Sequence, residues 1–165
     1  MITADNVLRA LHRSTLISEL NDAETDILRG LLAVRRFDAG EFIARPGVSS
    51  LTDALLILVY GNIEVSAIVD GEPMRLRLTE PGDLARIISF AGSNIVSIDA
   101  TIEVKEDCTV LLLERDRLES LLDTHSRIVY RVMRSLVRYT HGLARHKSAE
   151  NDEMSNYFYG LNGRF

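Results

Sequence analysis

The residues with the clearest chemical pattern are arginines near the C-terminus. On a helix, five arginines and His141 fall within about ±40° of one line: Arg127, Arg131, Arg134, Arg138 and Arg145. Residues 127–149 contain 6 basic and no acidic residues, whereas residues 1–126 contain 12 basic and 21 acidic ones. The stripe could bind an acidic protein partner, bind a polyanion, or be a solvated face that balances the acidic remainder. The acidic remainder opposes approach to nucleic acid or an anionic membrane.

Apolar residues occupy the opposite side of the same predicted helix. They recur with helical spacing at Val129, Val132, Met133, Leu136 and Leu143. This stripe predicts either the seam of a homodimer, which we favour, or a face that packs on the rest of the same chain.

Residues for catalysis or metal binding do not form a pattern. No histidine occurs between His12 and His125, and no nucleophile motif, metal-ligand spacing or phosphate-binding glycine loop is present. We therefore expect no enzyme activity, no metal and no cofactor. The single cysteine, Cys108, cannot form an intramolecular disulfide, which favours a reducing, cytoplasmic compartment. No apolar run approaches the roughly 18 residues of a membrane span, so no membrane insertion is expected.

The elements that must position these residues form three blocks. The sequence predicts a helix over residues 3–13 and a second one that begins at the cap Asn21, with Glu24 three residues later. From residue 34 to about 114, short apolar runs separated by turn residues predict about eight antiparallel strands. Helical spacing returns over residues 116–146. The expected fold is α+β, a jelly-roll-like antiparallel β-roll flanked by helices.

Several motifs in the β-block carry a family resemblance. They are residues 37–43 (FDAGEFI), Gly47, residues 61–65 (GNIEV), residues 81–84 (PGDL), and residues 100–104 (ATIEV) through Cys108 to residues 118–122 (LESLL). In this order they resemble the cyclic-nucleotide-binding domain of catabolite-activator-type regulators and protein kinase A regulatory subunits, over residues 16–146. A cupin, the other β-roll considered, would need histidine ligands that these strands lack.

The resemblance also implies where the ligand pocket lies. Gly82, Asp83 and Leu84 resemble the start of the phosphate-binding cassette, and Asp83 falls where the family has a ribose-binding Glu. Alignment on Ala100 and Cys108 puts Ile98 at the position of the phosphate-binding Arg and Asp99 at that of a Ser or Thr. Ile98 cannot pair with a phosphate and Asp99 would repel it, so the pocket is predicted to be degenerate. Arg86 could replace the missing cation.

These patterns predict one domain over residues 1–147, followed by a tail at 148–165. The 18 residues after Lys147 are too few for a helix-turn-helix, so no DNA binding is expected. The predicted function is a non-catalytic regulatory or protein-interaction domain that does not bind cyclic AMP or cyclic GMP. The alternative is a sensor that holds a small molecule or an atypically bound nucleotide in a modified pocket.

Overall fold

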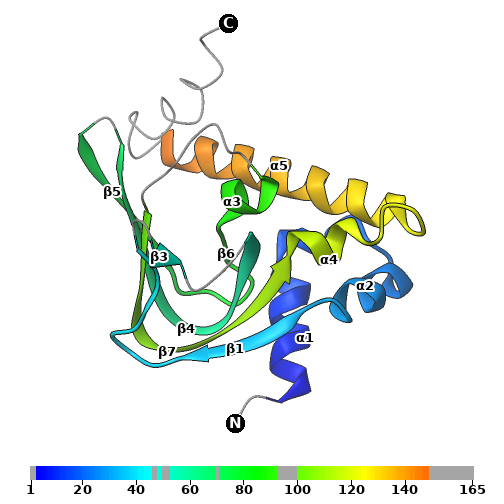
Figure 1. Ribbon diagram of the computed structural model, residues 1–165, viewed down its shortest axis with the longest axis horizontal. Coiled ribbons are helices and arrows are strands. Elements are labelled where there is room, and N and C mark those ends of the chain that lie inside the picture. The colour runs from blue at the N-terminus through cyan, green and yellow to red at the C-terminus, as the bar shows by residue number, and fades with distance from the viewer. Residues whose placement is uncertain (1–2, 46–47, 50–52, 70, 93–99, 149–165) are drawn as a thin grey trace, which may run out of the picture.

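The structure is a computed structural model that describes residues 3–45, 48–49, 53–69, 71–92 and 100–148. Along the chain, helices precede and follow a central block of strands, as the colours of Figure 1 show. In chain order the elements are α1 (Ala4–Arg13), the short 3-10 helix η1 (Thr15–Ile17), α2 (Asp22–Arg29), β1 (Ala33–Phe37), β2 (Phe42–Arg45), β3 (Val48–Ser49), β4 (Ala54–Val69), β5 (Glu72–Leu78), β6 (Leu84–Ala85), α3 (Ile87–Ala91), β7 (Ala100–Glu114), α4 (Arg115–Glu119) and α5 (Ser126–Ser148).

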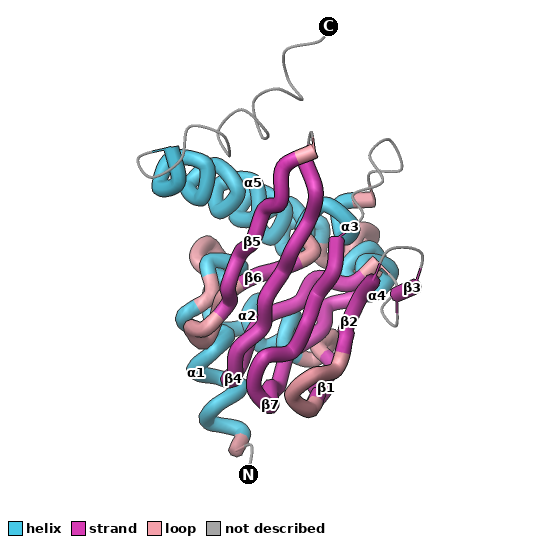
Figure 2. The backbone as a smooth tube through the Cα atoms, turned by 90° about the vertical axis from the view of Figure 1, so that its left-hand side faces the viewer, coloured by secondary structure: helices cyan, strands magenta, loops and turns pink. Residues whose placement is uncertain are grey.

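The strands form one antiparallel sheet that curls into a roll (Figure 2). Its order is β3-β2-β7-β4-β5, with β1 also paired to β7 and β6 to β4. The predicted α+β antiparallel roll is confirmed. About eight strands were expected, and the described residues form seven. The sequence predicts separate strands at the apolar runs 54–60 and 63–67, and these runs are one strand, β4. It also predicts two strands at 95–104 and 110–114, and the described residues of both fall in one strand, β7.

A bulge at Gly61 explains why β4 continues where a turn was expected. The pairing of β4 with β7 shifts register between Leu58 and Ile63, yet it resumes on both sides. Gly61 has φ +106°, and a Cβ there would lie 2.5 Å from the Cβ of Cys108. Only glycine permits both the positive φ and this close crossing. The strand therefore bends without ending.

Alternate residues of β4 and β7 face two different cores, as strand geometry requires. One cluster fills the interior of the roll and includes Ile43, Leu56, Leu58, Ile63, Val104 and Val110. The second lies between the sheet and the helices and includes Leu11, Leu16, Leu55, Ile57, Leu111, Val132 and Leu136. We call them the roll core and the helix core.

The flanking helices begin and end close to the predicted positions. The predicted cap of α2 is confirmed: the Asn21 side chain accepts from the Glu24 N–H, and the Glu24 carboxylate accepts from the Asn21 N–H. The C-terminal stretch divides into α4 and α5 at a turn over residues 120–125. α5 lies across the open side of the roll, above α3 and α4 (Figure 1).

The candidate pocket and the contacts of α5

The predicted start of the phosphate cassette is a tight turn between β5 and β6. Asp83 Oδ2 accepts hydrogen bonds from the N–H groups of Thr79 and Glu80 at 3.1 and 3.0 Å. The backbone of the same turn is bonded to Leu58 of β4 through Gly82 N–H and Asp83 C=O. The Asp83 carboxylate therefore closes the turn, and two of its hydrogen-bonding positions are already occupied by the backbone.

Gly82 lies in contact with the end of α1. Its φ is +97°, and a Cβ would lie 2.8 Å from Ser14 N and 2.9 Å from the carbonyl carbon of Arg13. A side chain at this position would force α1 away from the cassette. The cassette and the N-terminal helices are thus in direct backbone contact.

Arg86 begins the short helix α3 in an unusual conformation. Its φ of 67° is the one positive φ among the non-glycine residues that the structure describes. The left-handed region costs an L-residue about 1–2 kcal/mol. Burial lowers the pKa of the Arg86 guanidinium, and the negative charge of Asp53 opposes that shift. Arg86 is therefore a partly buried cation with a carboxylate in its surroundings.

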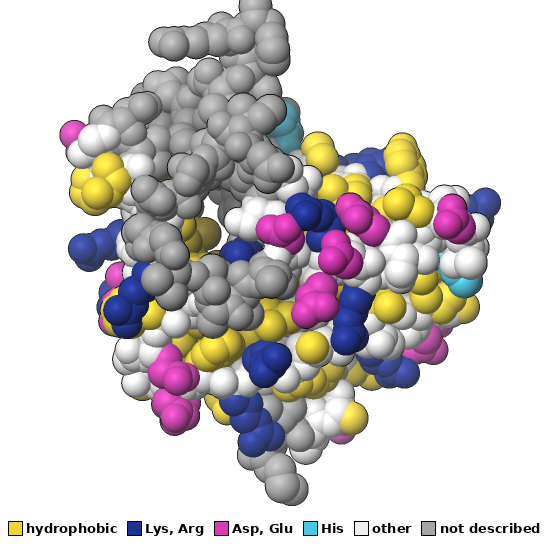
Figure 3. Space-filling model, viewed as in Figure 1, with side chains coloured by type: hydrophobic (Ala, Val, Ile, Leu, Met, Phe, Trp, Pro, Cys, Tyr) yellow, Lys and Arg dark blue, Asp and Glu magenta, His cyan; other side chains and the backbone are white. Residues whose placement is uncertain are grey.

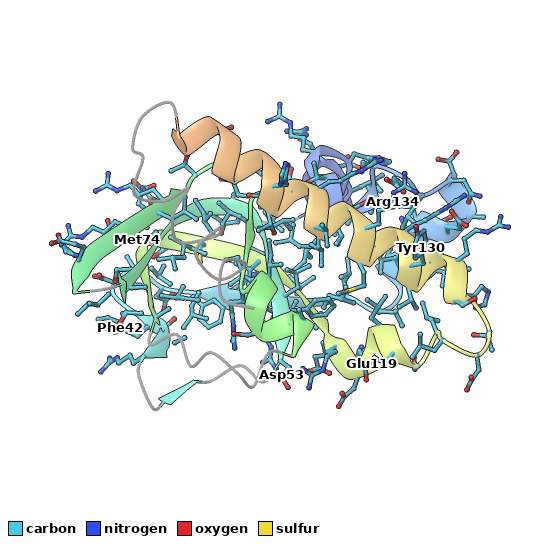
Figure 4. All side chains as sticks on the ribbon, turned by 90° about the horizontal axis from the view of Figure 1, so that it is seen from above. Phe42, Asp53, Met74, Glu119, Tyr130 and Arg134 are labelled. Carbon is cyan, nitrogen blue, oxygen red and sulfur yellow. The ribbon has the colours of Figure 1, made fainter. Side chains whose placement is uncertain are left out.

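A second arginine fixes the other end of α3. Arg115 Nη2 lies 2.6 Å from Asp53 Oδ2 and its Nε lies 3.8 Å from Glu119 Oε1. A Cβ on Gly92, the residue that ends α3, would lie 2.4 Å from Arg115 Nη1. Asp53 and Glu119 lie on the same side of the molecule in Figure 4. Asp53 is the residue immediately before β4. It forms an ion pair with Arg115 near the C-terminal end of α3, and its charge acts on Arg86 at the N-terminal end.

The remaining residues of the predicted pocket are Leu84, Ile98 and Asp99. Leu84 is buried in the helix core. Burial raises the pKa of the Tyr139 hydroxyl on α5, whereas a hydrogen bond from the Leu84 backbone lowers it. α5 therefore reaches the cassette directly. Ile98 and Asp99 lie outside the described residues.

Three arginines of the predicted basic stripe form ion pairs with the N-terminal helices. Arg131 Nη1 lies 2.8 Å from Glu24 Oε2, and Arg134 Nε lies 3.2 Å from Glu19 Oε1, which also pairs with Arg138. Figure 4 shows Arg134 on the side of α5 that faces the N-terminal helices. These arginines hold α5 against α2 and against the segment between η1 and α2.

The other members of the stripe are placed differently. Arg127 is exposed, and its positive charge helps to lower the pKa of Glu24. The side chain of Arg145 lies outside those that the structure describes. In Figure 3, acidic and basic side chains are interspersed over the visible face of the molecule instead of gathering into a region of one sign.

The apolar stripe of α5 faces the chain's own core. Val132 and Leu136 are buried there, and Val129 and Met133 pack against it, while the side chain of Leu143 is not described. Among the described side chains of α5, the large apolar ones that are exposed are Tyr130 and Val137, with 63% and 67% of their surface exposed. They are seven residues apart and so share one face. The predicted seam residues Val132 and Leu136 are buried in the chain's own core and present almost no surface to a second chain.

Within the described ranges, no three His, Cys, Asp or Glu side chains form a group that could hold a metal ion. In the same ranges, no helix combines the length and apolar character needed to cross a membrane. Cys108 is buried, and desolvation raises the pKa of its thiol to about 11, so the thiol is protonated and unreactive at neutral pH.

The chain belongs to the cyclic nucleotide-binding domain family. The sequence model of that family matches residues 34–125, which is more than half of the chain. Domains of this family are regulatory and non-catalytic in general. No match to a protein of curated function was found.

Solved structures share this fold at low sequence identity. A cyclic nucleotide-binding domain from Methylobacillus flagellatus KT has a TM-score of 0.71 and 15% identity, covering 88% of this chain and 80% of that one. The Thermus thermophilus catabolite activator protein has 0.66 and 24%, covering 86% and 63%. The regulatory subunit of a cAMP-independent protein kinase A from Trypanosoma brucei has 0.63 and 20%, covering 83% and 45%. At these identities the likeness concerns the fold alone.

The structure brings together some predicted site residues and adds others. Gly82, Asp83, Leu84 and Arg86 run from the turn between β5 and β6, through β6, to the start of α3. Asp53, Arg115 and Glu19, which the sequence did not single out, and Glu24, which it singled out only as a capping residue, supply the carboxylates and cation that these elements contact. Each lies far along the chain from its partner, so no local motif could have identified it.

Proposed function

We propose that this chain is a non-catalytic regulatory domain that acts through protein contacts and does not bind cyclic AMP or cyclic GMP at physiological concentrations. The main support is electrostatic. Arg86 is the one cation among residues 81–92, and the Asp53 carboxylate already lies in its field. A cyclic phosphate would therefore meet a cation that a carboxylate partly neutralises. In addition, the sequence has Ile98 where the family resemblance implies a phosphate-binding arginine.

The chemistry at the neighbouring positions supports the same proposal. The Asp83 carboxylate is engaged in the turn that it closes and is poorly available to a ribose hydroxyl. Asp99 adds a negative charge next to Ile98 in sequence. One structural neighbour is described as the regulatory subunit of a cAMP-independent kinase, which gives the fold a precedent for regulation without that ligand.

Calorimetric titration with cyclic AMP and cyclic GMP tests this proposal. We expect no heat of binding from the wild type and measurable binding from Ile98→Arg/Asp99→Ser, which restores a cation and removes a carboxylate. Losing one partner of a buried charged pair costs about 3–5 kcal/mol, or a factor of hundreds or more in affinity. Micromolar binding by the wild type would contradict the proposal.

The alternative function, a sensor that holds a small molecule or an atypically bound cyclic nucleotide in a modified pocket, rests on Arg86. Its partial burial and its left-handed backbone are features that often mark functional positions. An Arg86→Gln variant separates the two functions. If wild-type binding were found and this variant abolished it, the chain would be a sensor in which Arg86 replaces the missing arginine.

We further propose that the contact surface is the outer face of α5 and that the chain forms a homodimer there. Tyr130 and Val137 supply the apolar contacts, and the partly exposed Arg134 lies between them. An acidic partner protein could use the same face, because Arg127 and Arg138 are also exposed. The lone buried Cys108 supports a cytoplasmic location for such a domain.

Sedimentation tests the dimer. We expect a dimer at micromolar concentration for the wild type and a monomer for Tyr130→Ser/Val137→Ser. The matched control is Val34→Ser on β1, which removes another exposed apolar side chain and should remain dimeric. A monomeric wild type over this concentration range would remove the dimer from the proposal.

A further inference from the structure

A polar cleft lies outside the segment that matches the family. It occupies about 370 Å³ between the end of α1, η1 and the start of α2. Binding pockets for small molecules typically enclose about 300–1,000 Å³, so the volume suits a small metabolite. All its lining residues fall between residues 12 and 25, before the family match begins at residue 34.

The cleft has positive groups at one end and a carboxylate at the other. His12 and Arg13 come from the last turn of α1, and Asp22 comes from the first turn of α2. Neither His12 nor Arg13 forms an ion pair with any residue that the structure describes. An anionic group would be held at the α1 end, because a guanidinium binds phosphate or carboxylate oxygens strongly. Asp22 would accept from ligand hydroxyls.

Hydroxyl groups line the surface between these ends. Ser14 and Thr25 are buried, with 4% and 6% of their surface exposed, and Ser18 lies beside them. Ser14 Oγ accepts a hydrogen bond from the Leu16 N–H at 3.2 Å, so the hydroxyl hydrogen of Ser14 is still available to donate. A polar ligand could add hydrogen bonds to these hydroxyl groups.

The same residues also contact the cassette and α5. The backbone of Arg13 and Ser14 lies against Gly82 at the start of the cassette. Ser18 Oγ lies 3.3 Å from Ser135 Oγ of α5, and the adjacent Glu19 pairs with Arg134 and Arg138. A ligand in the cleft would therefore act on α5 and on the cassette without entering the roll.

We propose that this cleft binds a small hydroxylated anion of sugar-phosphate size and that its occupancy is transmitted to α5. The anionic group binds Arg13 and His12, the hydroxyls bind Asp22 and the Ser/Thr groups, and the contact between Ser18 and Ser135 carries the effect. This inference does not depend on whether the roll binds a cyclic nucleotide.

Ribose 5-phosphate is a suitable probe, with ribose and inorganic phosphate as controls that each lack one half of the ligand. In calorimetry of the full chain, ribose 5-phosphate should bind saturably and more tightly than either control. Arg13→Gln should weaken binding about tenfold or more, because it removes a charged hydrogen bond. Arg9→Gln makes the same change on the exposed side of α1 outside the cleft and should leave binding unchanged.

Three results would overturn the site. The first is the absence of saturable binding up to about 10 mM ribose 5-phosphate, because weaker binding would not matter. The second is equal weakening by Arg9→Gln, which would indicate nonspecific attraction. The third is loss of binding in Arg86→Gln, which would place the ligand in the cassette. Circular dichroism melting of each variant shows whether it is folded.

Transmission to α5 is tested by hydrogen exchange. Added ribose 5-phosphate should slow exchange in residues 126–142. Unchanged exchange with binding intact would overturn the proposed transmission.

Discussion

The roll core and the helix core lie on opposite faces of the same two long strands, yet they are built differently. The buried cluster of the roll core is apolar apart from the Cys108 thiol. The helix core is bordered by polar contacts that join distant segments: Ser18 with Ser135, Glu19 with Arg134, and Glu24 with Arg131. Both cores are therefore apolar inside, and the helix core differs in that polar contacts at its border join segments more than one hundred residues apart in the chain.

This difference indicates which part of the molecule can change. Apolar burial is not directional, so the roll core gives stability to a fixed scaffold. Partly exposed ion pairs contribute little free energy, but they respond to pH, salt and competing charges. α5 is attached through such contacts, and it also touches the cassette through Tyr139. The contacts that attach α5 on the helix side are thus the ones that a binding event could alter.

The largest expected effect tests whether α5 belongs to the core of its own chain. Leu136 is 1% exposed, and Leu136→Ala should lower the free energy of unfolding by about 2–5 kcal/mol, the range for buried leucine truncations. Val137→Ala, one residue further on and 67% exposed, should change it by no more than about 0.5 kcal/mol in the monomer. Urea denaturation measures both. Equal effects would mean that α5 is not packed as described.

An effect of about the same size is expected at the bulge that lets β4 contribute to both cores. Gly61→Ala combines a left-handed backbone, costing about 1–2 kcal/mol, with a clash against Cys108, costing about 1–3 kcal/mol. Gly40→Ala has a similar φ of +88° but no atom within 4 Å of the new Cβ. It should show the backbone cost alone. If the two variants melted alike, the close crossing of β4 and β7 would be disproved.

Local signals in the sequence predicted much of the fold. The capping box of Asn21 and Glu24 and the helical spacing of α5 are short-range patterns, and they identified α2 and the last helix. The continuity of β4 could not be predicted, because Gly61 resembles a turn residue in sequence, whereas its role as a bulge depends on β7, more than forty residues away.

The candidate site was less predictable because its contacts are nonlocal. The basic stripe of α5 was visible in sequence, but its partners Glu19 and Glu24 are more than one hundred residues earlier in the chain. Nothing in the local sequence indicates that Asp53 reaches Arg115, or that Arg86 adopts a left-handed backbone. The position of the cassette was predicted from the family resemblance. The residues that surround its charged side chains could be identified only in the folded structure.

The smallest expected effect concerns the ion pair between α2 and α5. The pKa of Glu24 is lowered, first by its hydrogen bond from the Asn21 backbone and then by the charges of Arg131 and Arg127. A carboxyl with a depressed folded-state pKa stabilises the fold above its unfolded pKa, near 4.3, and loses that contribution as pH falls through the folded value. Glu24→Gln should therefore be less stable than the wild type at neutral pH, and the difference should vanish in acid.

Urea denaturation at neutral pH and below about pH 4 measures this difference. Arg131→Gln should remove part of the same pH-dependent stability, since Arg131 is the ion-pair partner of Glu24 at 2.8 Å. Arg134→Gln is the matched control on the same helix, because Arg134 pairs with Glu19 and should leave the contribution of Glu24 intact. A pH-independent difference between Glu24→Gln and the wild type would mean that α5 is held to α2 by packing alone, and the contrast between the two cores would disappear at this contact.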